Sequence, residues 1–253
     1  MDLFSLSGRT ALITGGSRGI GLAIAQGLAA AGAGVVLNGR DEAALAAAAE
    51  WLRDGGATVT VAPFDVTEPE QIDSALARLA EAGLAIDILV NNAGIQRRAP
   101  LHEFSDADWH ELMRTNLDSV YFVGKAVARQ MIARGAGKII NIASVQAELA
   151  RPTIAPYTAS KGAVRNLTRG MCADWARYNI QINAIAPGYF DTPMNQALVK
   201  DPAFDAWLRG RTPSGRWGRL EDLHGVAVML ASRASDYING QTIFVDGGMV
   251  AVV

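Results

Sequence analysis

The chain has 253 residues, of which 50% are hydrophobic and 19% are charged, as is usual for one globular domain with a sizeable core. A net charge of −2 argues against nucleic-acid and anionic-membrane partners, because both bind basic patches. The one cysteine, Cys172, cannot form an internal disulfide, and no apolar run approaches the ~20 residues that span a bilayer. The first eight residues lack the basic and apolar pattern of an export signal, so we expect a cytoplasmic protein.

Short β-rich runs alternate with longer helical stretches along the whole chain. The expected strands are Thr10–Thr14, Gly34–Asn38, Thr58–Ala62, Ile86–Val90, Lys138–Ile142, Ile180–Ile185 and Thr242–Val245. The expected helices are Gly19–Ala31, Glu42–Arg53, Pro69–Ala82, Ala107–Ala133 and Ala155–Tyr178. This alternation predicts an α/β Rossmann fold, a doubly wound seven-stranded parallel sheet with helices on both faces. We expect a single domain over residues 1–253, with an irregular substrate lid at about 189–218.

A glycine-rich turn, Thr14-Gly15-Gly16-Ser17-Arg18-Gly19-Ile20-Gly21, joins the first strand to the first helix. Glycines permit a tight turn and a close approach of the backbone to a pyrophosphate, and the helix N-terminus supplies free N–H groups. A flexible turn without a ligand is the alternative, but this position between strand and helix is the one that dinucleotide binding requires. We expect the cofactor to bind at Gly15, Ser17, Arg18, Gly19, Ile20 and Gly21.

The end of the second strand indicates which nicotinamide cofactor binds. In NAD sites an acidic residue about 20 positions past the glycines bonds the ribose 2′-hydroxyl. Here Gly39 stands at that place and Arg40 follows. Arg18 and Arg40 can pair with a 2′-phosphate. Asp41 is the one nearby acid, and we interpret it as the N-cap of the helix that follows. The sequence therefore predicts NADP as the cofactor.

Tyr157 and Lys161 lie four positions apart in an expected helix, so both side chains project from one face. Reduction of a ketone needs an acid to protonate the alkoxide as hydride arrives. A lysine ammonium ~4 Å from a phenol could lower the phenol pKa from ~10 to near neutrality. A packed aromatic beside a solvated amine is the alternative for such a pair taken alone. The pair nevertheless predicts acid–base chemistry with Tyr157 as the proton donor.

Further motifs follow the glycine-rich turn Thr14–Gly21 in a definite order. They are Asn91-Asn92-Ala93-Gly94 after the fourth strand, Asn116 in the next helix, Ser144 after the fifth strand, Tyr157 with Lys161, and Pro187-Gly188 with Thr192. With the Gly-x-x-x-Gly-x-Gly turn, this set resembles the short-chain dehydrogenase/reductase family over essentially the whole chain. The resemblance implies an enzyme that interconverts a ketone and a secondary alcohol. It also implies a homotetramer with two-fold axes.

The same resemblance implies a role for each matching residue. Ser144 would hydrogen-bond the substrate oxygen, Lys161 would hold the nicotinamide ribose, and Asn116 would anchor a water that relays protons. With Tyr157, these residues form the expected catalytic set. Further cofactor contacts are implied at Asp65, Val66, Asn92, Ala93, Gly94, Tyr157, Lys161, Pro187, Gly188 and Thr192. The three histidines show no ligand spacing, so we expect no metal.

Polar and basic residues gather in the segments expected to border the substrate. They are Arg97 and Arg98 after the fourth strand, Gln146 and Arg151 after the fifth, and Tyr189 after the sixth, with Ser144 and Tyr157 at the centre. Ligands of open parallel sheets bind outside the carboxyl ends of the strands, where these segments meet. Solvated surface charges are the alternative for Arg97 and Arg98. Arg98, and after it Arg97, is the best candidate to meet a carboxylate, with Arg151 in reserve. These polar and basic side chains around the reacting centre predict a hydroxylated, anionic small molecule as the substrate.

Three runs narrow the resemblance within the family: Gly94–Pro100, Ala143–Gln146 and Arg211–Gly218. They resemble the gluconate 5-dehydrogenases, a group that interconverts D-gluconate and 5-dehydro-D-gluconate with NADP(H). The 2-deoxy-D-gluconate 3-dehydrogenases and the 3-oxoacyl carrier-protein reductases are the alternatives within the family. A cofactor-sensing regulator without activity is the alternative from another class. Because such regulators typically lose the tyrosine or the lysine, we favour an enzyme.

Overall fold

The computed structural model describes residues 2–253, and a sheet of seven parallel strands forms its centre, in the order β3-β2-β1-β4-β5-β6-β7. The strands are β1 (Thr10–Ile13), β2 (Gly34–Gly39), β3 (Val59–Pro63), β4 (Ile88–Asn91), β5 (Gly137–Ile142), β6 (Ile180–Pro187) and β7 (Thr242–Val245). The strand order reverses between β1 and β4, and ligands of such sheets bind beyond the strand ends at this point. The expected doubly wound Rossmann fold is confirmed.

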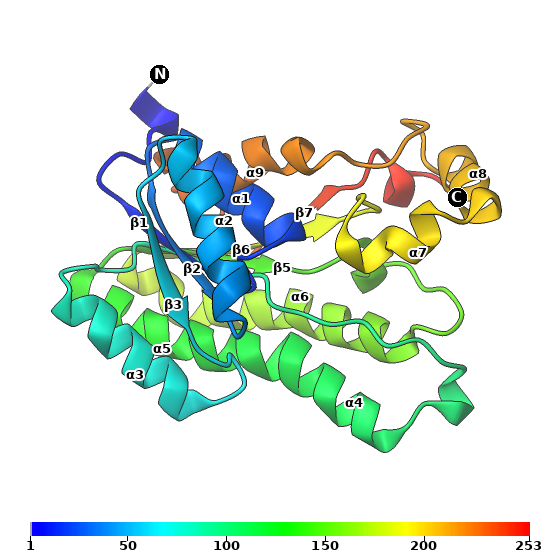
Figure 1. Cartoon of the computed structure of the whole chain (residues 1–253), viewed down its shortest axis with the longest axis horizontal. Coiled ribbons are helices and arrows are strands. Elements are labelled where there is room, and N and C mark those ends of the chain that lie inside the picture. Colours follow the sequence, from blue (N-terminus) through cyan, green and yellow to red (C-terminus); the bar gives the residue numbers. More distant parts are fainter. Residues whose placement is uncertain (1) are drawn as a thin grey trace.

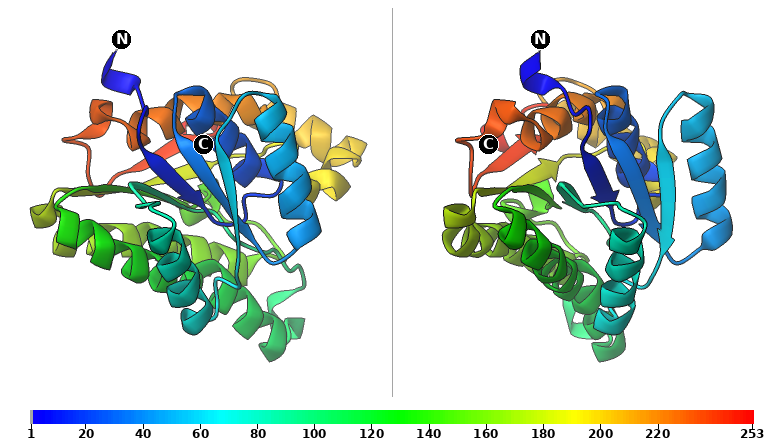
Figure 2. Two further views of the ribbon diagram at one scale, coloured as in Figure 1. Left: turned by 60° about the vertical axis from the view of Figure 1, so that its left-hand side comes forward. Right: turned by 90° about the vertical axis from the view of Figure 1, so that its left-hand side faces the viewer.

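Helices cover both faces of the sheet (Figure 1). The upper layer in that view holds α1 (Gly19–Ala30), α2 (Glu42–Asp54) and α9 (His224–Ala231). The lower layer holds α3 (Pro69–Glu81), α5 (Ser119–Arg134) and α6 (Ala155–Trp175). Figure 2 shows the sheet between the two layers from the side. Within residues 2–253, no helix combines the length and the apolar character that crossing a membrane needs.

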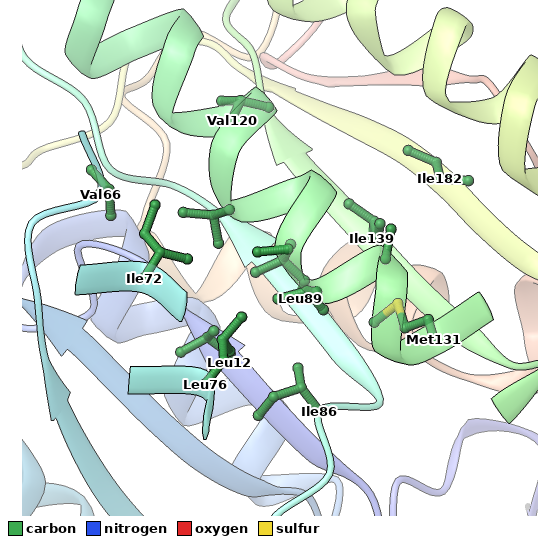
Figure 3. Close-up of a cluster of buried hydrophobic side chains, with 14 of the residues drawn as sticks. Leu12, Val66, Ile72, Leu76, Ile86, Leu89, Val120, Met131, Ile139 and Ile182 are labelled. Carbon is green, nitrogen blue, oxygen red and sulfur yellow. The ribbon is translucent and has the colours of Figure 1, made fainter. Parts of the chain in front are cut away.

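The packing of the lower layer fixes the strands that carry the site. Leu12, Leu89 and Ile139 project from β1, β4 and β5 and meet Ile72 of α3 and Met131 of α5 (Figure 3). All five side chains are essentially inaccessible to solvent. Strands buried on both faces are mostly apolar, as β4 is, and the buried Asn183 of β6 is accommodated because its amide donates to the Ile238 carbonyl at 2.8 Å. The loops at the carboxyl ends of the strands therefore start from rigid positions.

The helix expected at Ala107–Ala133 is interrupted. It consists of α4 (Asp106–Met113), a π-helical turn at Arg114–Asp118, and α5. A π turn inserts one residue into a helix and changes the direction of the side chains in it. In this turn Asn116 is completely buried. The sequence pattern did not reveal the interruption, because the flanking residues keep their helical spacing.

The segment at about 189–218 is more regular than the sequence suggested. It contains α7 (Gln196–Val199) and α8 (Pro202–Arg211), which Figure 1 shows at one end of the sheet. The α8 helix begins where the Asp201 carboxylate accepts hydrogen bonds from two backbone amides and Pro202 takes the first helical position. A bridge between Phe190 and Gly218 closes the base of the segment. The segment is thus a compact helical flap.

Candidate active site

A cavity of about 600 Å³ lies at the carboxyl ends of the strands. Every residue that the sequence suggested for catalysis, cofactor or substrate lines it, except Gly21 and Asn116. The lining includes Gly15, Ser17, Arg18, Gly19, Ile20, Arg40, Asp65, Val66, Asn92, Ala93, Gly94, Arg97, Arg98, Ser144, Gln146, Arg151, Tyr157, Lys161, Pro187, Gly188, Tyr189 and Thr192. In the part of the chain that the structure describes, no three His, Cys, Asp or Glu side chains gather as a metal-ligand set.

The glycine-rich turn leaves room that a side chain would fill. Gly15 and Gly19 have left-handed backbone angles (φ of 62° and 55°), which other residues adopt at a cost. Gly21 lies behind the turn, where a Cβ would overlap the Gly15 carbonyl and come within 2.5 Å of the Asn92 amide. The Asn92 amide donates to the carbonyls of Thr14 (2.9 Å) and Gly15 (3.1 Å), which ties the turn to β4. The role of Gly21 is therefore close packing, and it does not line the cavity.

The part of the cavity that Arg18, Arg40 and Asp65 line fits a 2′-phosphorylated nucleotide. The Asp41 carboxylate accepts a hydrogen bond from the Ala44 amide (3.0 Å), so it caps α2 as expected. The Arg40 guanidinium is largely exposed and lies 3.6 Å from the Asp65 carboxylate. Burial alone would raise the pKa of Asp65, but hydrogen bonds from Thr67 and the charge of Arg40 hold it below its usual value. Arg40 and Arg18 thus both line the cavity, and the exposed Arg40 side chain is available to a phosphate.

Tyr157 and Lys161 both reach the cavity from α6, as their spacing predicted. The Lys161 ammonium is buried and donates to the Ile142 carbonyl at 2.7 Å, and it lies 5.7 Å from the centre of the Tyr157 ring. Burial lowers the pKa of Lys161 to about 8. Burial of the phenol, opposed by a hydrogen bond with Ser144, raises the pKa of Tyr157 to about 12.

The prediction that Lys161 brings the pKa of Tyr157 near neutrality is therefore wrong for the protein groups by themselves. It assumed an ammonium ~4 Å from the phenol oxygen at an effective dielectric constant of about 20. The ammonium instead faces the Ile142 carbonyl, and desolvation of the phenolate outweighs the opposing hydrogen bond with Ser144. Tyr157 is consequently a protonated acid at neutral pH.

Asn116 is placed to hold the loop after β4. Its side-chain oxygen accepts from the Ile95 amide (2.8 Å), and its nitrogen donates to the Ile95 carbonyl (3.0 Å) and the Ser160 hydroxyl (3.3 Å). Ser160 in turn donates to the Tyr157 carbonyl at 2.8 Å. Asn116 thus connects the loop to the helix turn that carries Tyr157. Ser160 was not among the residues predicted from the sequence, although it directly precedes Lys161. A water relay through Asn116 stays a prediction.

The three arginines of the substrate end lie in different surroundings. Arg97 pairs with Glu111 (2.8 Å) and Asp108 (3.4 Å) on α4, so its charge is already neutralised. Arg98 and Arg151 lie close enough that burial and the charge of Arg151 lower the pKa of the Arg98 guanidinium. Cations that repel each other beside a cavity attract an anion. The structure therefore disfavours Arg97 as the anion-binding residue and favours the other two.

Aromatic side chains of the flap support this end of the cavity. The Arg151 guanidinium stacks over the Phe204 ring of α8 at 5.5 Å. The Tyr189 ring lies 5.5 Å from Phe204, 6.3 Å from Trp207 and 6.1 Å from Trp217. The Trp217 indole donates to Asp205 at 2.6 Å, which fastens α8 to the chain that follows it. Of these aromatics only Tyr189 was predicted to border the substrate, although the concentration of aromatic residues in one segment was a visible signal.

Comparisons with known proteins agree with this geometry. The family described as enoyl-(acyl carrier protein) reductase matches residues 15–250. Gluconate 5-dehydrogenase of Gluconobacter oxydans is 58% identical over 248 residues, 98% of this chain and 97% of that protein. The 5-keto-D-gluconate 5-reductase of Escherichia coli K12 is 51% identical over 252 residues, 100% of this chain and 99% of that protein.

Solved structures point the same way. The crystal structure of a gluconate 5-dehydrogenase from Burkholderia cenocepacia, in complex with NADP and tartrate, has a TM-score of 0.97 and 62% identity, covering 100% of this chain and 99% of that one. The family match and these relatives, which are more than 50% identical, each cover nearly the full length of the chain. The chain belongs to the short-chain dehydrogenase/reductase family and is an NADP-dependent oxidoreductase of that family.

Proposed function

We propose that the protein interconverts D-gluconate and 5-dehydro-D-gluconate with NADP(H). The observation that carries this proposal is the pair of cations, Arg98 and Arg151, that lines the same cavity as Ser144 and Tyr157. A six-carbon sugar acid holds its carboxylate several bonds from C5. It therefore needs a positive charge displaced from the proton donor, and this pair supplies it.

The names of the relatives support the same substrate. The Gluconobacter oxydans and Escherichia coli proteins are a gluconate 5-dehydrogenase and a 5-keto-D-gluconate 5-reductase. The crystal structure of the Burkholderia cenocepacia enzyme is a complex with NADP and tartrate, and tartrate is a hydroxylated anion. An anionic, hydroxylated ligand is what the Arg98 and Arg151 side chains would favour here.

In the proposed reaction, bound NADPH supplies the hydride that reduces C5. The turn at Gly15–Gly21 and the N-terminus of α1 would hold its phosphates, and Arg18 and Arg40 its 2′-phosphate. Asp65, Val66 and the segments Asn92–Gly94, Pro187–Gly188 and Thr192 would border its other parts.

The side chains of the site then complete the reduction. The Ser144 hydroxyl donates a hydrogen bond to the carbonyl oxygen, which stabilises the negative charge that develops there. The Tyr157 phenol gives its proton to that oxygen, and its high pKa keeps the proton in place until the oxygen becomes basic. Lys161 holds the ribose and keeps a positive charge near the phenol. In the oxidative direction the same proton returns to Tyr157.

Three further features belong to the proposal. The helical flap at about 189–218 closes over the substrate, so that Tyr189 and Gln146 contact it. A homotetramer forms by pairing of α4, α5 and α6 between subunits, as the family resemblance implied. A single cysteine suits a reducing compartment, so we propose a cytoplasmic location.

The test is the rate of NADPH oxidation with a panel of keto acids and ketoses. We expect 5-dehydro-D-gluconate to give the highest kcat/KM, with D-gluconate as the product. A higher kcat/KM for a 3-dehydro-2-deoxy acid would identify the alternative 2-deoxy-D-gluconate 3-dehydrogenase activity. A preference for 3-oxoacyl thioesters would refute a sugar-acid substrate altogether.

A further inference from the structure

Gln146 is a buried residue that lines the cavity, as Ser144, Tyr157, Arg98 and Arg151 do. It lies in a short helical turn after β5, and only 6% of its surface is exposed. Its backbone amide donates to the Ser144 hydroxyl oxygen (3.2 Å), so its place is fixed relative to the residue that meets the substrate oxygen. Its side chain lines the cavity together with Tyr189 and Arg151.

Only one end of the Gln146 side-chain amide has a hydrogen-bond partner in the protein. Its nitrogen lies 3.5 Å from the Tyr189 hydroxyl, to which it donates, whereas its oxygen has no hydrogen-bond partner among residues 2–253. Turning the amide over would exchange the two ends and leave the nitrogen unpaired instead. In either orientation one buried polar end is left without a protein partner, in a residue that lines the cavity. An unpaired buried polar group destabilises a site unless a ligand pairs with it.

The neighbours of this free end indicate what would pair with it. Ser144 lies on one side, where the reacting carbonyl binds in the proposed function, and Tyr189 lies on the other. Arg98, Arg151 and Tyr189 line the same cavity, and both arginines act electrostatically on the Tyr189 phenol, so we expect the carboxylate on the Tyr189 side of Gln146. A hydroxyl can donate to the amide oxygen or accept from the amide nitrogen. A hydroxyl on the chain between the carbonyl and the carboxylate therefore fits the free end in either orientation.

We propose that Gln146 determines specificity by hydrogen-bonding a substrate hydroxyl at C4 or C3, so that the enzyme prefers a fully hydroxylated acid over a deoxy acid. This inference rests on the proposed function, which sets the direction in which the substrate lies. A site built to hydrogen-bond a hydroxyl rejects the analogue that lacks it, because the buried amide is then left unpaired. An apolar residue at position 146 would lose that discrimination.

The experiment compares kcat/KM for 5-dehydro-D-gluconate and its 3-deoxy, 4-deoxy and 6-deoxy analogues. In the unaltered enzyme we expect a loss of about ten- to hundredfold for the 3-deoxy or the 4-deoxy analogue. The 6-deoxy analogue should lose much less, because C6 lies on the far side of the reacting carbon. In Gln146→Met, which keeps the side-chain volume, the penalty should shrink to within about threefold. Gln241→Met, an exposed glutamine outside the cavity lining, is the control and should keep the full penalty.

Two results would overturn the inference. One is an unaltered enzyme that reduces the 3-deoxy and 4-deoxy analogues as fast as the parent acid, which needs no variant to fold. The other is a deoxy penalty that survives in a Gln146→Met protein that binds NADPH normally. The same series made from neutral ketohexoses separates this test from the proposed function. An unaltered enzyme that shows no preference for acids over ketohexoses refutes the anionic substrate, whereas the change in the deoxy penalty between the unaltered enzyme and Gln146→Met, in either series, reports on Gln146.

Discussion

The two ends of the cavity are built in different ways. The cofactor end is shaped mostly by backbone, as in the glycine turn that Asn92 ties to β4. The substrate end is shaped by side chains from three distant segments, such as Arg98, Arg151 and Tyr189. The first kind of site depends on local conformation, and the second depends on tertiary packing against α8. We infer that the first end sets the family chemistry, while the second sets which molecule is reduced.

The largest effect is expected where the two ends meet, at Tyr157. Tyr157→Phe removes the transferable proton and keeps the ring, so kcat should fall by about 10²–10⁴-fold. NADPH affinity, measured by fluorescence titration, should change little, because the cofactor end is intact. Tyr237→Phe, at a fully exposed tyrosine, is the matched control. If Tyr157→Phe retains more than a tenth of the activity, another group delivers the proton.

At the cofactor end, Arg40→Asp should weaken NADPH binding and leave NADH binding nearly unchanged. A guanidinium that pairs with a phosphate is replaced by a repelling carboxylate, and because Arg40 is exposed we expect about a tenfold loss in affinity at moderate salt. The ratio of the dissociation constants for the two cofactors measures the change. Arg78→Asp makes the same charge change at an exposed arginine of α3 and serves as the control. An unaltered enzyme that binds NADH as tightly as NADPH would contradict the role given to Arg18 and Arg40.

A smaller and graded effect is expected from pH. Burial lowers the pKa of Lys161 from 10.5 to about 8, so its ammonium is charged below that pH and is lost as the pH rises through it. Tyr157 keeps its proton up to a pH of about 12 and is not the group that titrates. The initial rate of reduction should therefore decline above pH 8, by up to about tenfold per pH unit. In Lys161→Arg, whose cation does not titrate in this range, any remaining activity should show no such decline. A flat profile in the unaltered enzyme up to pH 10 would refute this assignment.

The same contrast explains what the sequence could predict. The glycine turn, the Asp41 cap and the Tyr157–Lys161 pair are local patterns whose spacing implies their geometry, and the structure places them as expected. The π turn that buries Asn116 interrupts a helix without breaking its pattern. The neutralisation of Arg97 depends on α4, which only the folded chain brings next to it. The side chains of the substrate end acquire their environments from tertiary contacts, so the sequence named the arginines but placed Arg97 above Arg151, an order that the ion pairs of Arg97 reverse.

The central claim is that Arg98 and Arg151 select an anionic substrate, and one ratio tests it most directly. That ratio is kcat/KM for 5-dehydro-D-gluconate divided by kcat/KM for a neutral ketohexose. Relative to the unaltered enzyme, it should fall by roughly ten- to hundredfold in Arg98→Ala or Arg151→Ala, because a charge-assisted hydrogen bond is lost only for the acid. In Arg97→Ala it should change less than about twofold, because that guanidinium is already paired with Glu111 and Asp108. A ratio that stays the same in all three variants would contradict the account.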